Sequence, residues 1–258
     1  MPNQSFDAVA GKVERAKFHI KELAGQLNDP ANLNRYGVGW RIDYERREAV
    51  IFGSTPQELY NSFGIIIGEV IHQLRSALEH TVWQLVILNG KSPDKRTGFP
   101  IFWNAASDKT KYLAESPSML SGVNTKAVAI IDGLQPMGPD YATHPLYVLN
   151  EMWNWDKHRL LNLVSVAPIA FQVSFIYPGG RVEQKIVDVP PGVQIIDGTE
   201  IKRISFPDDY TPEVKVVGVM AGIYKFDVGP AAGQSFTELL NKLVEFAESL
   251  INKLIATI

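Results

Sequence analysis

The sequence predicts an α+β protein: a bundle of about four helices with an antiparallel β-sheet inserted before the C-terminal helix. Apolar residues recur at helical spacing in four long stretches, and they alternate with polar residues between the third and fourth of these. The predicted helices lie near residues 7–27, 57–89, 144–164 and 235–256. Because the last helix returns after the strands, we expect one domain over residues 1–258, with a helical core at 5–165 and 234–258 and a β-rich portion at 166–230.

The composition excludes several classes of function. The 258 residues include no cysteine, which excludes disulfides, thiolate zinc sites and a cysteine nucleophile. The formal net charge of −3 gives no general attraction to nucleic acid, so an RNA contact would need a local basic patch. The N-terminus lacks the apolar core of a secretory signal, and no apolar run reaches the roughly 18 residues of a membrane span. We therefore expect a cytoplasmic protein without membrane contact.

The first predicted helix ends at a turn-forming Asn-Asp-Pro sequence, residues 28–30. His19 lies off the apolar stripe of this helix, which predicts a surface or boundary position. From Val38 to Phe52 the apolar residues alternate around a charged turn, which predicts a β-hairpin. We expect this hairpin to join the later sheet or to pack near it.

The segment between Gly90 and His144 is predicted to be rich in loops. It contains a short extended apolar piece, Phe99–Phe102, and a short helix over Thr125–Ile131. Connections this long are uncommon in compact domains, so we expect the segment to pack over the helices as a cover.

The β-rich portion begins with a predicted hairpin, in which Val173–Tyr177 and Val182–Val187 flank a Pro-Gly-Gly-Arg turn. Ser235 and Glu238, at the start of the last helix, have the spacing of a capping box. Further strands are predicted over Val193–Ile196, Ile201–Phe206 and Val214–Phe226.

The long second helix carries the first group of candidate functional residues. On a helical wheel Arg75 lies at the boundary between an apolar and a polar face. The helix also contains Gly64 and Gly68, each of which costs about 1 kcal/mol relative to alanine. The apolar face comprises Val70, Ile71, Leu74, Ala77, Leu78, Val82 and Leu85. The polar face comprises Glu69, His72, Ser76, Glu79, His80 and Trp83.

The second group lies on the third predicted helix and comprises Asn150, Asp156, Lys157, His158 and Arg159. Asp156 falls on the apolar face of that helix, where an unpaired carboxylate would cost several kcal/mol. It should therefore have a cationic partner on another helix, with Arg75 the first candidate and His80 the second. An ion pair that only clamps the two helices together would satisfy the same requirement.

Two motifs together resemble those of an uncharacterised family of bacterial proteins. The long helix contains H-x-L-R-S-A-L-E-H from His72 to His80, and D-K-H-R follows at Asp156–Arg159. Members of that family pair these two motifs, and the early helix around Arg15–Leu23 also fits. The resemblance spans roughly residues 10 to 165 and implies no particular activity.

Arg75 and His80 have the spacing R-x4-H on a helix, which resembles the motif of HEPN-superfamily ribonucleases. The resemblance implies a homodimeric helical bundle that cleaves RNA without a metal or other cofactor, with Arg75 and His80 as catalytic residues. A guanidinium can stabilise charge at a pentacoordinate phosphorus, and an imidazole can move the proton of the attacking 2′-hydroxyl. The predicted strands depart from the HEPN core, which is all-helical. Supporting residues would be His72, Glu79, Asn150, Asp156, Lys157, His158 and Arg159.

Two other functions stay open. A non-catalytic binding protein could bind a phosphate at Lys157–Arg159, while its Arg, His and Asp residues form a structural ion-pair network. A metal-dependent hydrolase could take its ligands from the histidines and Glu79, although His72 and His80 diverge by about 80° around the helix. The binding groove would be lined by Trp83, Trp103, Trp153, Trp155 and Tyr147.

Overall fold

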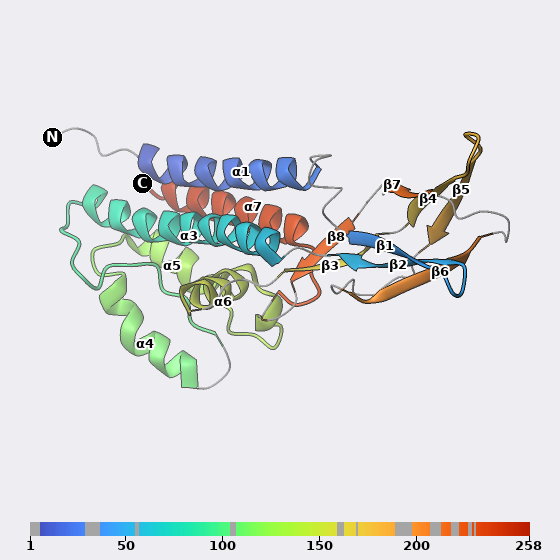
Figure 1. Ribbon diagram of the computed structural model, residues 1–258. Helices are drawn as coiled ribbons and strands as arrows, with labels where there is room; N and C mark the ends of the chain where they lie inside the picture. The colour runs from blue at the N-terminus through green and yellow to red at the C-terminus, as the bar shows by residue number, and fades with distance from the viewer. Residues whose placement is uncertain are drawn as a thin grey trace. The chain divides into compact units, whose positions relative to one another are not determined.

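The computed structural model has an α+β architecture, as the sequence predicts (Figure 1). It describes residues 6–28, 37–54, 57–103, 107–158, 163–168, 170–188, 198–206, 213–217, 222–226, 229 and 231–258.

Two compact units make up the structure, and segments of both alternate along the chain. The helical unit comprises Met1–Glu22, Gly64–Leu161 and Val228–Ile258. The β unit comprises Leu23–Phe63 and Asn162–Asp227. The single domain predicted over residues 1–258 stays a prediction.

The four long helices predicted from the sequence are present. In the helical unit α1, α3 and α7 lie side by side (Figure 1); the Lys17–Glu248 ion pair joins α1 to α7, and His19 of α1 lies 3.4 Å from Glu69 of α3. All seven residues of the predicted apolar face of α3 are at most 1% exposed, which confirms that face. The four long helices are α1, Asp7–Asn28, α3, Gln57–Leu88, α6, Pro145–His158, and α7, Phe236–Ile255.

Two of the helix termini differ from the prediction. Helix α6 is described as far as His158, and the predicted helix to residue 164 is wrong at its end because Leu163 already begins strand β3. Val164 and Val166 are β-branched and alternate along β3, a pattern that favours a strand. At α7, Ser235 occupies the N-cap, but its side chain makes no capping hydrogen bond, so the predicted capping box does not form.

The segment before α6 contains more helix than the sequence predicts. Helix α5, Thr125–Gly133, confirms the short predicted helix, and a single 3₁₀ turn covers Tyr141–Thr143. Helix α4, Ser107–Met119, was not predicted. Its sequence is mostly polar and includes Pro117, which lacks a backbone N–H and ordinarily argues against a helix.

The early hairpin joins a later strand, as expected. Strands β1, Gly37–Asp43, and β2, Glu48–Ser54, pair antiparallel, and β2 also pairs with β6, Glu200–Ser205. In a second sheet β4, Ala170–Ile176, lies between β5, Val182–Asp188, and β7, Glu213–Val217. Strand β3, Leu163–Pro168, pairs with β8, Gly222–Phe226. The strand predicted over Val193–Ile196 lies outside the described residues.

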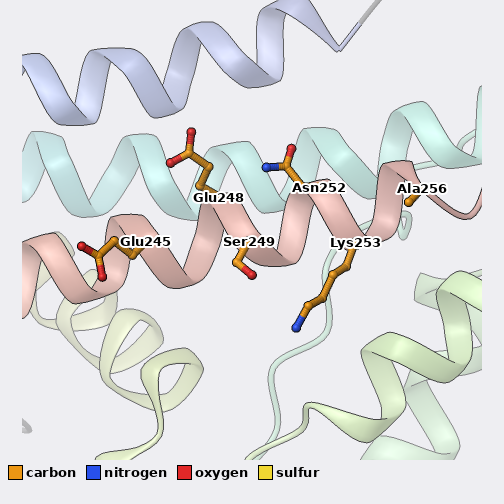
Figure 2. A pocket seen from close by; sticks show the side chains of 6 residues that line it. All are labelled: Glu245, Glu248, Ser249, Asn252, Lys253 and Ala256. Atoms are coloured by element: carbon orange, nitrogen blue, oxygen red, sulfur yellow. The ribbon is translucent and has the colours of Figure 1, made fainter.

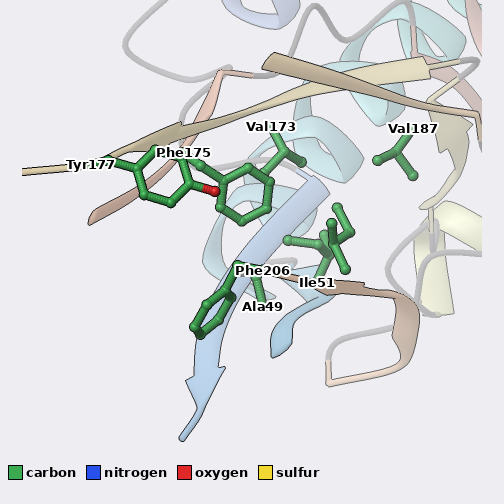
Figure 3. Close-up of a cluster of buried hydrophobic side chains, with 8 residues drawn as sticks. Ala49, Ile51, Val173, Phe175, Tyr177, Val187 and Phe206 are labelled. Carbon is green, nitrogen blue, oxygen red and sulfur yellow. The ribbon is translucent and has the colours of Figure 1, made fainter. Parts of the chain in front are cut away.

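One apolar cluster forms the core of the β unit (Figure 3). Alternate residues on or next to β4, together with one residue of β5, provide one side, and residues on or next to β2 and β6 provide the other. The two three-stranded sheets therefore share a core through one face each, the arrangement that alternation predicts. The cluster comprises Ala49, Ile51, Val173, Phe175, Tyr177, Val187, Ile204 and Phe206.

His19 is buried, so the predicted surface or boundary position is wrong. Its Nδ1 lies 3.3 Å from Glu22 on its own helix and 3.4 Å from Glu69 on α3. These two carboxylates give the imidazole polar partners where α1 meets α3, so it can be buried without losing its hydrogen bonds. None of the helices within the described ranges has the length and apolar content needed to cross a bilayer.

Candidate functional site

Arg75, at the boundary of the two faces of α3, is buried with 6% of its surface exposed. Its Nη1 lies 2.6 Å from Glu79 Oε1, one helical turn further along α3, and its Nη2 donates a 3.0 Å hydrogen bond to the carbonyl of Phe99. The guanidinium carbon lies 5.3 Å from the centre of the Trp153 ring on α6. Burial lowers the pKa of Arg75, and the charge of Glu79 opposes this shift.

Glu79 also binds the main chain of Phe99, so that Arg75, Glu79 and Phe99 each contact the other two. Its Oε2 accepts a 2.7 Å hydrogen bond from the backbone N–H of Phe99, whose carbonyl is bound by Arg75. We call Arg75, Glu79 and the main chain of Phe99 the Phe99 anchor. A side chain at Gly98 would bring a Cβ within 2.5 Å of Glu79 Oε2, so this close approach requires glycine. The R-S-A-L-E part of the motif therefore binds the chain's own backbone.

Gln135 extends this pattern along the extended piece Phe99–Phe102. Its buried side-chain amide donates to the carbonyl of Pro100 and accepts from the backbone N–H of Phe102, both at 3.0 Å. Main-chain groups of Phe99, Pro100 and Phe102 are thus bound by side chains, as a neighbouring strand would bind them. The roles of Gly98 and Gln135 were not predicted from the sequence. The available signal was an apolar extended piece with no predicted strand partner, whose backbone groups must bond elsewhere.

Asp156 is half-buried, and its carboxylate lies so close over Gly68 of α3 that a Cβ there would overlap it. This contact and that of Trp153 with Arg75 confirm that α3 and α6 pack together. The predicted Arg75–Asp156 ion pair is wrong, because Arg75 pairs with Glu79 on its own helix. Gly68 is seven residues, or about 10 Å of helix, before Arg75. Burial raises the pKa of Asp156, and the charge of His72 opposes this shift.

His80 is exposed and five residues beyond Arg75, which places it about 140° further around α3. Burial of part of the ring lowers the pKa of His80, the positive charge of Lys12 on α1 lowers it further, and Glu79 opposes both. Arg75 and His80 therefore point in different directions. Arg75 points towards Phe99 and Trp153, and His80 points towards α1.

Three further predicted supporting residues lie on α6. Asn150 is buried, whereas Lys157 and His158 are exposed. The Lys157 Nζ lies 2.9 Å from the centre of the Trp153 ring, so Lys157 and Arg75 contact the same indole. Partial burial lowers the pKa of Lys157, as does the charge of Arg75, while Glu79 opposes. Arg159 lies outside the described residues.

The aromatic residues proposed to line a groove have separate neighbours. Trp103 packs edge-on against Tyr147, with ring centres 5.5 Å apart. The Trp155 ring lies against Gly229, and Trp83 is partly exposed on α3. The common groove stays a prediction.

An open hollow lies along the outer face of α7 (Figure 2). Glu248, one of the residues that line it, is bound by Lys17 of α1 at 2.8 Å. None of the predicted site residues contributes to the hollow, and its mixture of charges defines no particular chemistry. It is lined by Glu245, Glu248, Ser249, Asn252, Lys253 and Ala256.

Within the ranges that the structure describes, no three histidine, aspartate or glutamate side chains converge as metal ligands would. Comparison with protein-family models, curated proteins and solved structures gave no match.

Proposed function

We propose that the protein is a non-catalytic binding protein in which the helix carrying Arg75 is part of the scaffold. The observation that carries this proposal is the Phe99 anchor. Arg75 is buried and already has an internal carboxylate, an internal carbonyl and an aromatic ring as partners. Because the guanidinium is buried, it could reach a phosphate in solvent only by moving away from Glu79, which would then lose its cation in a partly buried position.

The partner that fits the remaining exposed groups best is a single strand of RNA. Lys157 and His158 are exposed at the end of α6, and Lys157 lies beside the indole of Trp153. On binding, Lys157 would leave the Trp153 ring for a phosphate, and the face of the indole that it covers would become free for a base, the combination typical of surfaces that bind single strands. The proposal keeps the cytoplasmic location, the homodimer and the absence of a cofactor that we expect from the sequence.

A metal-independent ribonuclease of the HEPN type is the second candidate. It rests on His80, which is exposed and has a lowered pKa, so that its imidazole is mostly neutral at pH 7 and can accept a proton. In that case Arg75 would have to be released from Glu79 when RNA binds.

One experiment separates the two candidates. Purified protein and its His80→Ala variant are incubated with a fluorescent single-stranded RNA in EDTA, and cleavage and binding are measured on the same samples. We expect no cleavage by either protein, and binding that Lys157→Ala weakens several-fold while Lys126→Ala, an exposed lysine on α5, leaves it unchanged. Cleavage by the wild type that a folded His80→Ala variant lacks would establish the ribonuclease. An absence of RNA binding would refute the proposed partner.

A further inference from the structure

Strand β5 is the edge of its sheet among the strands that the structure describes, with β4 as its neighbour. Its outer face is apolar at two positions, because Val182 is 53% exposed and Ile186 is 76% exposed. Gln184, between them, is exposed as well. An exposed edge strand of this kind is a template for another strand unless something blocks it.

The hairpin geometry shows which main-chain groups of β5 face away from β4. Tyr177 donates a 2.8 Å hydrogen bond to the carbonyl of Arg181, so these two residues form a hydrogen-bonded pair at the end of the hairpin. Hydrogen-bonded pairs alternate with non-hydrogen-bonded ones along an antiparallel ladder. In the observed register Val182, Gln184 and Ile186 therefore fall at the non-hydrogen-bonded positions, and their N–H and C=O groups point outward from the sheet.

The side chains of β5 are complementary to those of a second, antiparallel β5. When the two strands meet about Gln184, each Val182 faces the Ile186 of the other copy, and each Glu183 faces the other copy's Lys185. A lysine on an edge strand usually opposes such pairing, but in this register it meets a carboxylate. A register centred on Lys185 would also pair the outward N–H and C=O groups, but it would place two lysines directly opposite each other at the axis, which is destabilising.

We propose that two copies of this chain pair edge to edge through β5, antiparallel about Gln184. The β5–β4–β7 sheet of one copy and the same sheet of the other copy then become one six-stranded sheet. The contact is isologous, so it closes as a dimer and does not propagate into a fibre. This surface is in the β unit and does not depend on the proposed RNA contact or on the long helix α3.

Cross-linking tests the pairing directly, because the natural chain has no cysteine. In a hydrogen-bonded antiparallel pair the two Cα atoms at position 184 would be about 5.5 Å apart. Gln184→Cys should therefore be joined to its own copy almost completely by a short cross-linker that reacts with two thiols. The matched control is Asp188→Cys on the same exposed strand, whose two thiols would lie about 25 Å apart. Equal cross-linking of both variants, or of neither, would overturn the proposal.

A charge exchange supplies a second test that does not rely on cross-linking. By sedimentation, Glu183→Lys and Lys185→Glu should each weaken the dimer about tenfold, since two like-charged pairs then face each other across the axis. The double variant Glu183→Lys/Lys185→Glu should restore the affinity of the wild type, and circular dichroism checks that each variant folds. A wild type that stays monomeric up to about 100 μM, or a dimer that none of these changes affects, would refute the pairing.

Discussion

Two arginines, one in each unit, are bound by carboxylates in opposite ways. Arg75 in the helical unit is buried and has one carboxylate partner, Glu79. Arg203 on β6 has a side chain that is 30% exposed and contacts Asp43, Glu48 and Glu200, at the ends of three neighbouring strands. Both guanidiniums are paired, but only the first has been removed from water.

The directions of the pKa shifts express this difference. Burial lowers the pKa of Arg75, whereas the hydrogen bonds that Arg203 donates to Glu200 and Glu48 raise the pKa of Arg203. A buried ion pair must recover the cost of leaving water, and here it does so by also binding the backbone of Phe99. The network around Arg203 stays hydrated and is screened by salt. The buried arginine thus determines where a loop lies, and the exposed one adds only modestly to a sheet that main-chain bonds already hold.

The largest effect should come from Arg75→Met, which keeps the apolar stem and removes the charge. Glu79 and the carbonyl of Phe99 would lose their partner, so we expect the free energy of unfolding to fall by about 2–4 kcal/mol. The lower part of the usual range for buried pairs is appropriate because the Glu79 side chain is one-third exposed, at 34%. Urea unfolding at pH 7 measures the change.

The double variant Arg75→Met/Glu79→Gln is the control for this prediction. It leaves no unpaired carboxylate, and its amide oxygen can still accept from Phe99, so it should be more stable than the single variant. A loss below about 0.5 kcal/mol for Arg75→Met alone would show that the anchor does not stabilise the fold.

An intermediate effect is expected for Gly98→Ala. The added Cβ would lie 2.5 Å from Glu79 Oε2 and would push the carboxylate away from Arg75 and Phe99. We expect a loss of about 1–2 kcal/mol in urea unfolding. Gly11→Ala on α1 is the matched control, since its Cβ would meet no atom within 4 Å. That control should be neutral or stabilising by up to about 1 kcal/mol, and equal losses for both variants would remove the steric explanation.

The smallest effect is expected for Arg203→Met, and it should depend on pH and salt. A backbone hydrogen bond from Arg46 and the side chain of Arg203 lower the pKa of Asp43, and Arg203 lowers the pKa of Glu200. A lowered pKa in the folded state stabilises above the unfolded pKa and loses this contribution as the pH falls through the folded value. Arg203→Met should therefore be less stable than the wild type at pH 7 and less so in 1 M salt, and the difference should shrink as the pH falls below the ordinary carboxyl pKa range and through the lowered folded-state pKa values.

Thermal unfolding across pH and salt checks this last prediction. A difference that persists unchanged at low pH would mean that Arg203 acts through packing of its apolar stem and not through its carboxylate partners.

The positions of the helices and strands followed from periodicity, because burial on one face leaves a repeat in the sequence. The face of α3 that includes Leu74 and Leu78 and the hairpin around the Pro-Gly-Gly turn were both predicted in this way. Helix α4 was not predicted, because its sequence has little apolar periodicity and contains Pro117. Strand β3 was not predicted, because the helix predicted over residues 144–164 includes its first two residues.

The sequence by itself determined that Arg75 lies at the edge of an apolar face and that Asp156 lies on a partly buried one. The tertiary structure alone decided their partners. Glu79 lies one turn from Arg75 wherever α3 forms a helix. Its role in binding the main chain depends on Phe99, 20 residues further along the chain, packing beside it. The Asp156 carboxylate can lie directly over Gly68 because a Cβ at that position would overlap it. Helical spacing fixes which side of a helix a residue occupies, whereas the neighbour on that side depends on how distant segments pack.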